Sequence, residues 1–151
     1  GYEVPVLISS LEKFLGWNIL SKAYLVGAGD LGAALLGYRG FNDQGLDIVA
    51  TFDNDPRKIG GKIHGKNVYA LDKFADLVKR NGVLIGILAV PRGVAQDVAE
   101  IMIRAGIRAI WNFTSVRLLV PPSIIVQDEN LASSLAVLSK RLAQSLQRSP
   151  S

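Results

Sequence analysis

Short apolar runs alternate along this chain with segments in which apolar residues recur every three or four positions. The apolar runs predict strands, and the three-to-four spacing predicts helices. The predicted strands are Ala23–Val26, Leu46–Phe52, Lys66–Tyr69, Val83–Val90, Ile107–Phe113 and Ile124–Val126. The predicted helices are Pro5–Leu15, Leu31–Tyr38, Leu71–Val78, Val94–Ala105 and Leu131–Leu146, with loops at 39–45 and 54–65. Strands that alternate with helices predict an α/β fold with a doubly wound parallel sheet.

The first predicted strand runs directly into a glycine turn of the pattern G-x-G-x-x-G, which opens the next helix. A strand, a glycine turn and a helix in this order are typical of the phosphate-binding start of a Rossmann-type fold. The free N–H groups and the positive dipole end of the helix suit a diphosphate. The candidate binding residues are Gly27, Ala28, Gly29, Asp30, Leu31 and Gly32.

Asp53 follows the second predicted strand, about 20 residues after the last glycine, where this fold places an acid that holds a ribose. A carboxylate there accepts hydrogen bonds from both adenosine-ribose hydroxyls and repels a 2′-phosphate. The spacing therefore favours NAD over NADP. The alternative is an acid in a solvated loop.

Two further groups of residues end predicted strands at the same carboxyl edge of the sheet, where ligands of this fold bind. Ala89, Val90 and Pro91 suit a close wall for the ribose or the nicotinamide. Asn112 and Phe113 offer an amide and a ring to the nicotinamide, and core packing is the alternative for Phe113.

Composition narrows the possible functions. The chain has 151 residues, of which 49% are hydrophobic and 20% charged, so a globular domain is expected. It has no cysteine, which excludes disulfides and indicates a cytoplasmic location. With His64 as the single histidine we expect no metal site and no catalytic residue. No apolar run reaches the length of a membrane span, and a net charge of +4 does not argue for nucleic acid.

The side chains of several polar residues near these motifs have other expected roles than binding the ligand. The Asp30 side chain is expected to point to solvent, Asp55 to form a turn with Pro56, and His64 to be exposed. Lys58 is expected to be solvated, and the alternative is a place beside the adenosine.

Several separated motifs together resemble the Rex family of redox-sensing transcriptional repressors. The matching stretches are Gly1-Tyr2-x-Val4, Val26–Gly32, Tyr38-x-Gly40-Phe41, Phe52–Gly60, Val68-Tyr69, Ala89–Pro91, Gly106-Ile107, Asn112–Thr114 and Val116–Leu118 with Val120-Pro121. The resemblance implies an NADH- and NAD+-binding domain, and a homodimer in which a C-terminal helix crosses to the partner. It also implies an N-terminal winged-helix domain that binds DNA, which we expect to be absent from this chain.

The resemblance implies that a tyrosine and an aspartate take part in switching between the subunits. The tyrosine corresponds to Tyr38, and at the position of the aspartate this chain has Asn130. Both are switch candidates. A tyrosine with a buried, satisfied hydroxyl is the alternative for Tyr38. Other departures from the family pattern are Asp30 and the stretch 139–141.

The predicted organisation has three parts: a lead-in helix and linker at 1–20, an NAD(H)-binding domain at 21–130, and a dimerisation helix at 131–147. Five leucines of that helix, Leu131, Leu135, Leu138, Leu142 and Leu146, fall on one stripe. The predicted function is a redox sensor that is not an enzyme. The alternatives are a fragment of an NAD-dependent dehydrogenase and a CoA-binding domain of the acyl-CoA synthetase type.

Overall fold

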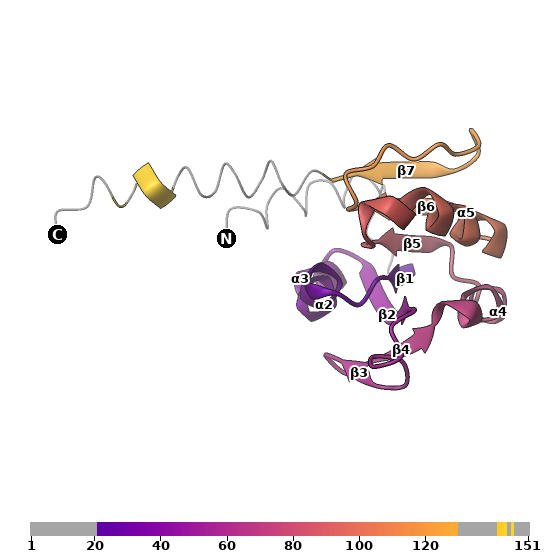
Figure 1. The fold of residues 1–151 in the computed structure, drawn as a ribbon, viewed down its shortest axis with the longest axis horizontal. Coiled ribbons are helices and arrows are strands. Elements are labelled where there is room, and N and C mark those ends of the chain that lie inside the picture. Colours follow the sequence, from indigo (N-terminus) through magenta and orange to yellow (C-terminus); the bar gives the residue numbers. More distant parts are fainter. Residues whose placement is uncertain (1–20, 130–141, 145, 147–151) are drawn as a thin grey trace.

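The computed structural model describes residues 21–129, 142–144 and 146 of the chain, and these residues form a sheet flanked by helices (Figure 1). The strand order is β3-β4-β2-β1-β5-β6-β7. Neighbouring strands are parallel, except that β3 runs antiparallel to β4. The strands are β1 (Ser21–Val26), β2 (Leu46–Asp53), β3 (Lys62–Ile63), β4 (Lys66–Ala70), β5 (Ile85–Leu88), β6 (Ala109–Asn112) and β7 (Ile125–Asp128). The helices are α2 (Asp30–Gly37), α3 (Gly40–Asp43), α4 (Phe74–Asn81) and α5 (Ala95–Ala105), with short 3-10 turns at Leu71–Lys73 and Arg92–Val94. The predicted Rossmann-type sheet is thus confirmed.

Helices cover both faces of the sheet, and the alternation of side chains along β1 shows how (Figure 1). Ala23 and Leu25 pack with α2 and α3 in one core, whereas Tyr24 and Val26 pack with α4 and α5 in the other. Because both faces of this strand are buried from Ala23 to Val26, that part of it lacks charged residues, as expected for a central parallel strand.

Glycines end helices α4 and α5. Gly82 follows α4 with φ 63°, and Gly106 follows α5 with φ 114°. Residues other than glycine rarely adopt this left-handed conformation, so the helices end there.

The predicted loops both contain an element that the sequence pattern does not reveal. Residues 39–45 include the four-residue helix α3, which buries Phe41 against Trp111 at a ring-centroid distance of 5.5 Å. Residues 54–65 include β3, which forms a hairpin with β4 through His64 and Gly65. The two strands predicted at 83–90 and 107–113 are shorter, since β5 and β6 each span four residues.

Two predicted helices fall largely outside the described residues. These are Pro5–Leu15 and Leu131–Leu146, together with the switch candidate Asn130. From the second helix the structure describes residues 142–144 and 146, which are helical. Within the described part of the chain, no helix has the length and apolar character needed to cross a bilayer.

Candidate functional site

The glycine turn lies at the centre of the sheet, where β1 has β2 on one side and β5 on the other. A cavity of about 490 Å³ opens at this point. In open α/β sheets this is the place where ligands bind, because the connections on either side of the central strand diverge and leave a crevice. The cavity is lined by the turn, the end of β2 with its following loop, residues 89–91 and one side of α5.

Two glycines of the turn are required by close backbone packing, and the third leaves space for a ligand. A Cβ on Gly27 would overlap the carbonyl of Ala89, and a Cβ on Gly32 would overlap the carbonyl of Gly27. Gly27 also has φ 120°. A Cβ on Gly29, in contrast, would meet no atom within 4 Å. The open space at Gly29 is therefore on the ligand side of the turn.

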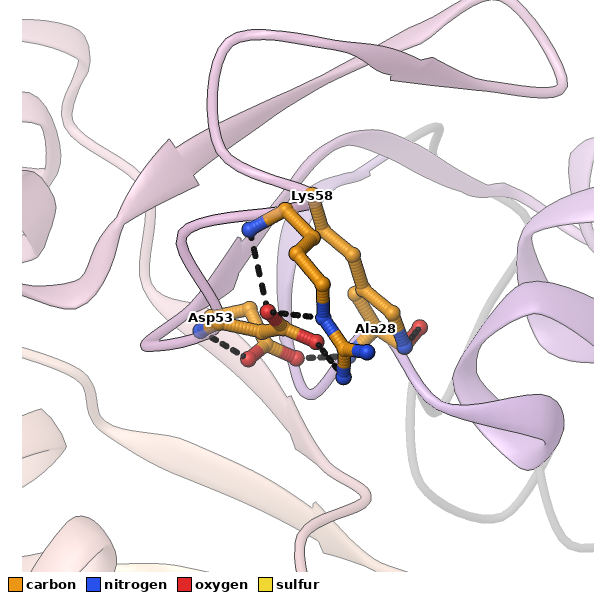
Figure 2. A network of polar contacts seen from close by, with 5 residues as sticks. Ala28, Asp53 and Lys58 are labelled. Carbon is orange, nitrogen blue, oxygen red and sulfur yellow. Dashed lines mark hydrogen bonds and ion pairs between the residues drawn. The ribbon is translucent and has the colours of Figure 1, made fainter.

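Three side chains hold the backbone of the turn at Gly27 and Ala28. The Thr51 hydroxyl donates to the Gly27 carbonyl at 3.0 Å. The Ala28 amide donates to Oδ2 of Asp53 at 2.7 Å, and Nζ of Lys58 donates to the Ala28 carbonyl at 2.7 Å. Figure 2 shows Asp53 and Lys58 around Ala28. The conformation of the turn is thus set by residues of β2 and of the loop after it.

The other oxygen of Asp53 accepts a hydrogen bond from the Asp55 amide at 2.8 Å. Each Asp53 oxygen therefore has one protein donor. Because a carboxylate has about four lone-pair positions, acceptor capacity remains for ligand hydroxyls.

The Asp55 carboxylate accepts hydrogen bonds from the Arg57 amide at 3.0 Å and from the Arg57 guanidinium at 3.1 Å. The hydrogen bonds from Arg57 lower the pKa of Asp55 below its ordinary value. Asp55 thus forms a turn, as predicted.

The structure brings most of the predicted binding residues together. The predicted residues that line the cavity are Gly27, Ala28, Gly29, Asp53, Ala89, Val90 and Pro91. Asp30, Leu31 and Gly32 form the first turn of α2, and Asp30 is exposed as expected. The N–H groups of this first turn have no partner within the helix, because the first helical hydrogen bond runs from the Ala33 amide to the Gly29 carbonyl.

Asn112 and Phe113 do not line this cavity. The Asn112 side chain is 1% exposed, and its amide donates to the Val116 carbonyl at 2.8 Å and to Asp128 at 2.9 Å. Its oxygen accepts two hydrogen bonds from Thr114, at 3.0 and 2.6 Å. Phe113 packs on Trp111 with ring centroids 4.9 Å apart. In the described chain Asn112 thus fixes the loop after β6 and joins it to β7, and Phe113 packs in the core.

Tyr38 lies at the opposite end of α2 from the glycine turn. Its ring is half-buried and packs edge-on against Phe41, with centroids 4.8 Å apart. It lines a separate cavity together with the start of β2 and with His64, which is exposed as predicted. The described chain therefore does not bring Tyr38 to the cavity at the glycine turn.

The sequence interpretation missed Thr51 and misjudged Lys58. The expectation that Lys58 is solvated is wrong, because the loop after β2 folds back and carries its ammonium to the Ala28 carbonyl. For Thr51 a signal exists, since a hydroxyl between the apolar residues Ala50 and Phe52 of a buried strand needs an acceptor.

Comparison with known proteins supports this geometry. Residues 18–116 match a family model described as "CoA binding domain". The redox-sensing transcriptional repressor Rex of Treponema denticola is 51% identical over 138 residues, which cover 91% of this chain and 66% of the relative. Rex of Caldicellulosiruptor bescii is 42% identical, with 97% of this chain and 67% of the relative covered. The chain belongs to the Rex family.

A solved Rex-family structure has the same fold. RSP, a Rex-family repressor, was crystallised with β-NADH, and it matches 95% of this chain at a TM-score of 0.77 and 37% identity, covering 70% of its own length. RSP was also crystallised with β-NAD+ and operator DNA, and there the TM-score is 0.76. The chain spans about two thirds of the length of the curated Rex relatives.

Proposed function

We propose that this chain is the NADH- and NAD+-binding, redox-sensing domain of a transcriptional repressor. The observation that carries the proposal is the position of Asp53 beside the glycine turn, with its carboxylate bonded to the Ala28 amide. The names of the Rex relatives and the RSP complexes with NADH and NAD+ support it.

The residues of the cavity fit a dinucleotide. The first-turn amides of α2 and the positive end of its dipole would hold the diphosphate. The space in front of Gly29 allows the phosphates to approach the backbone. Asp53 would accept hydrogen bonds from the adenosine-ribose hydroxyls, and Ala89–Pro91 would form the wall beyond the diphosphate. When bound, the nicotinamide supplies the redox-sensitive group, which exists in an oxidised charged form and a reduced neutral form.

Asp53 also separates NADH from its phosphorylated relatives. NADPH carries a phosphate on the 2′-oxygen of the adenosine ribose, and coenzyme A carries one on the 3′-oxygen. Either phosphate would face the Asp53 carboxylate, and like charges in close contact repel. NADH and NAD+ are therefore the ligands that this site favours, although the description of the matching family model is "CoA binding domain".

We further propose that the domain senses and does not catalyse hydride transfer. Catalysis would require a positioned general acid or base next to the nicotinamide. The ionisable residues that line the cavity are carboxylates and Lys58, grouped mainly at the Asp53 side, where the adenosine would lie. The repressor names of the relatives support this part of the proposal.

In the whole protein the cofactor would act through dimer geometry on a DNA-binding domain. The resemblance implies that a winged-helix domain binds the operator and that the helix at 131–147 joins two subunits, with Tyr38 and Asn130 as switch candidates. The exposure of Leu142 and Leu146, at 59% and 68%, is consistent with a partner on this helix. The RSP complex with operator DNA supports the link to transcription.

Calorimetric titration with NADH, NAD+, NADPH and coenzyme A tests the proposal. We expect the chain to bind NADH and NAD+ and to bind NADPH and coenzyme A more weakly. Coenzyme A as the tightest ligand would contradict the proposal. In a parallel assay, NADH oxidation that depends on added 2-oxo acids and is abolished in Gly29→Asp would favour the dehydrogenase alternative.

A further inference from the structure

Lys58 is the basic side chain among the described residues that line the cavity at the glycine turn. The acidic residues of the same lining are Asp53, Asp55 and Asp97. Asp55 pairs with Arg57 at 3.1 Å, whereas within the described part of the chain Asp53 and Asp97 form no ion pair. A dinucleotide adds a doubly charged diphosphate to this surface. A cation beside the turn would offset part of this negative charge.

The position of Lys58 leaves most of its hydrogen-bonding capacity unused. The residue is half-buried, and its Nζ donates to the Ala28 carbonyl at 2.7 Å (Figure 2). An ammonium group has three N–H donors, so two remain. Within the described part of the chain, Lys58 forms no ion pair with a carboxylate, unlike its neighbour Arg57. It is thus a partly desolvated cation that is anchored at the turn and lacks an anion.

We propose that Lys58 is a ligand-contacting residue that pairs its ammonium with the phosphate charge of the adenylate half of the dinucleotide. This inference rests on the proposed function and names the residue that supplies positive charge at that site. The hydrogen bond to Ala28 holds the ammonium next to the turn before the ligand arrives.

The helix start alone supplies limited positive charge for a diphosphate. The dipole of α2 offers about half an elementary charge at the helix start. Asp30 occupies the first position of that helix and opposes an anion. An ammonium that is already partly desolvated and held by one hydrogen bond loses less entropy on binding phosphate than a free lysine side chain, which favours a contribution to affinity.

Binding measurements on matched variants test the role of Lys58. Lys58→Met removes both the charge and the hydrogen bond, and Lys58→Gln removes the charge but keeps a donor. Lys79→Met is the control, since Lys79 is an exposed residue in the last turn of α4 and its loss changes the net charge equally. Calorimetry with adenosine, AMP, ADP-ribose and NADH over a range of salt concentrations separates charge from shape, and thermal unfolding verifies that each variant folds.

We expect both Lys58 variants to bind AMP, ADP-ribose and NADH roughly tenfold more weakly or worse, the scale of a hydrogen bond to a charged group. Adenosine binding should change little, and the salt dependence of NADH affinity should flatten. Unchanged affinity for AMP and ADP-ribose, or an equal loss for adenosine and AMP, would overturn the role of Lys58. Failure of the unaltered chain to bind NADH would instead contradict the proposed function itself.

Discussion

The hydroxyl of Thr51 donates a hydrogen bond to the carbonyl of Gly27 at 3.0 Å, and both residues are buried. The bond joins a residue two positions before the end of β2 to the first glycine of the turn that follows β1. The amide of the same glycine donates to the Phe52 carbonyl at 2.8 Å. Strand β2 therefore holds the glycine turn in place as well as carrying Asp53. The position of Asp53 relative to the turn is set before a ligand binds.

Replacing Thr51 by Val should lower the free energy of unfolding by about 1–3 kcal/mol, because the buried Gly27 carbonyl loses its side-chain donor. Urea unfolding measures the change. Thr51→Ser keeps the hydroxyl and serves as the control, with a smaller loss expected. Equal losses in the two variants would show that the hydrogen bond contributes nothing beyond packing.

Gly29→Ala and Gly32→Ala should separate binding from folding. A Cβ at position 32 overlaps the Gly27 carbonyl, so Gly32→Ala should destabilise the fold by roughly 1–3 kcal/mol or more. A Cβ at position 29 meets no protein atom within 4 Å, so Gly29→Ala should melt within a few degrees of the unaltered chain. It should nevertheless bind NADH poorly, because the methyl group occupies the space of the phosphates. Normal NADH affinity in Gly29→Ala would place the ligand elsewhere.

Asp53→Asn should weaken NADH binding by roughly 1–2 kcal/mol, since the ribose hydroxyls lose hydrogen bonds to a charged acceptor. It should also reduce the preference for NADH over NADPH, because the repulsion of the 2′-phosphate is removed. Paired calorimetric titrations with both nucleotides measure the two effects. Asp43→Asn, at an exposed position of α3, is the control and should change neither affinity. A preference for NADH that persists in Asp53→Asn would assign the selection to another residue.

Substituting both Leu142 and Leu146 by Ser should convert the expected homodimer to a monomer. The two side chains are 59% and 68% exposed, so their loss should leave the described domain stable while it removes apolar contact with a partner. Light scattering at micromolar concentration measures the mass. Ala143→Ser with Gln144→Ser alters neighbouring exposed positions and should remain dimeric. If the unaltered chain is a monomer, the proposal that this helix joins two subunits is wrong.

Hydrophobic periodicity was sufficient to predict the larger elements, because each of them buries a face against the sheet. Phe74 and Val78 of α4 and Val98 and Met102 of α5 are buried. Helix α3 could not be found in this way, since four residues do not complete a periodic pattern. It forms because Phe41 packs against Trp111, a contact between residues far apart in the sequence.

The sequence predicted the binding residues whose positions follow from the spacing of strands and helices. It predicted less well the residues whose side-chain contacts depend on loops or on neighbouring strands. The glycine turn and Asp53 follow from spacing along the chain, because the strand and helix lengths of this fold fix that spacing. The contact of Lys58 with Ala28 depends on how an irregular loop folds back. The hydrogen bonds of Asn112 depend on Asp128, which belongs to the next strand of the sheet.

The central position of β1 has a consequence for the order of events during synthesis. Its pairing with β2 is available early, but its other neighbour is β5, where Ala23 pairs with Ile85. A nascent chain that ends before this strand leaves one edge of β1 without partners and lacks the Ala89 carbonyl against which Gly27 packs. The nucleotide pocket therefore cannot be completed before β5 and α5 have been synthesised. A ligand cannot guide the early folding of this chain, and it stabilises only the finished sheet by mass action.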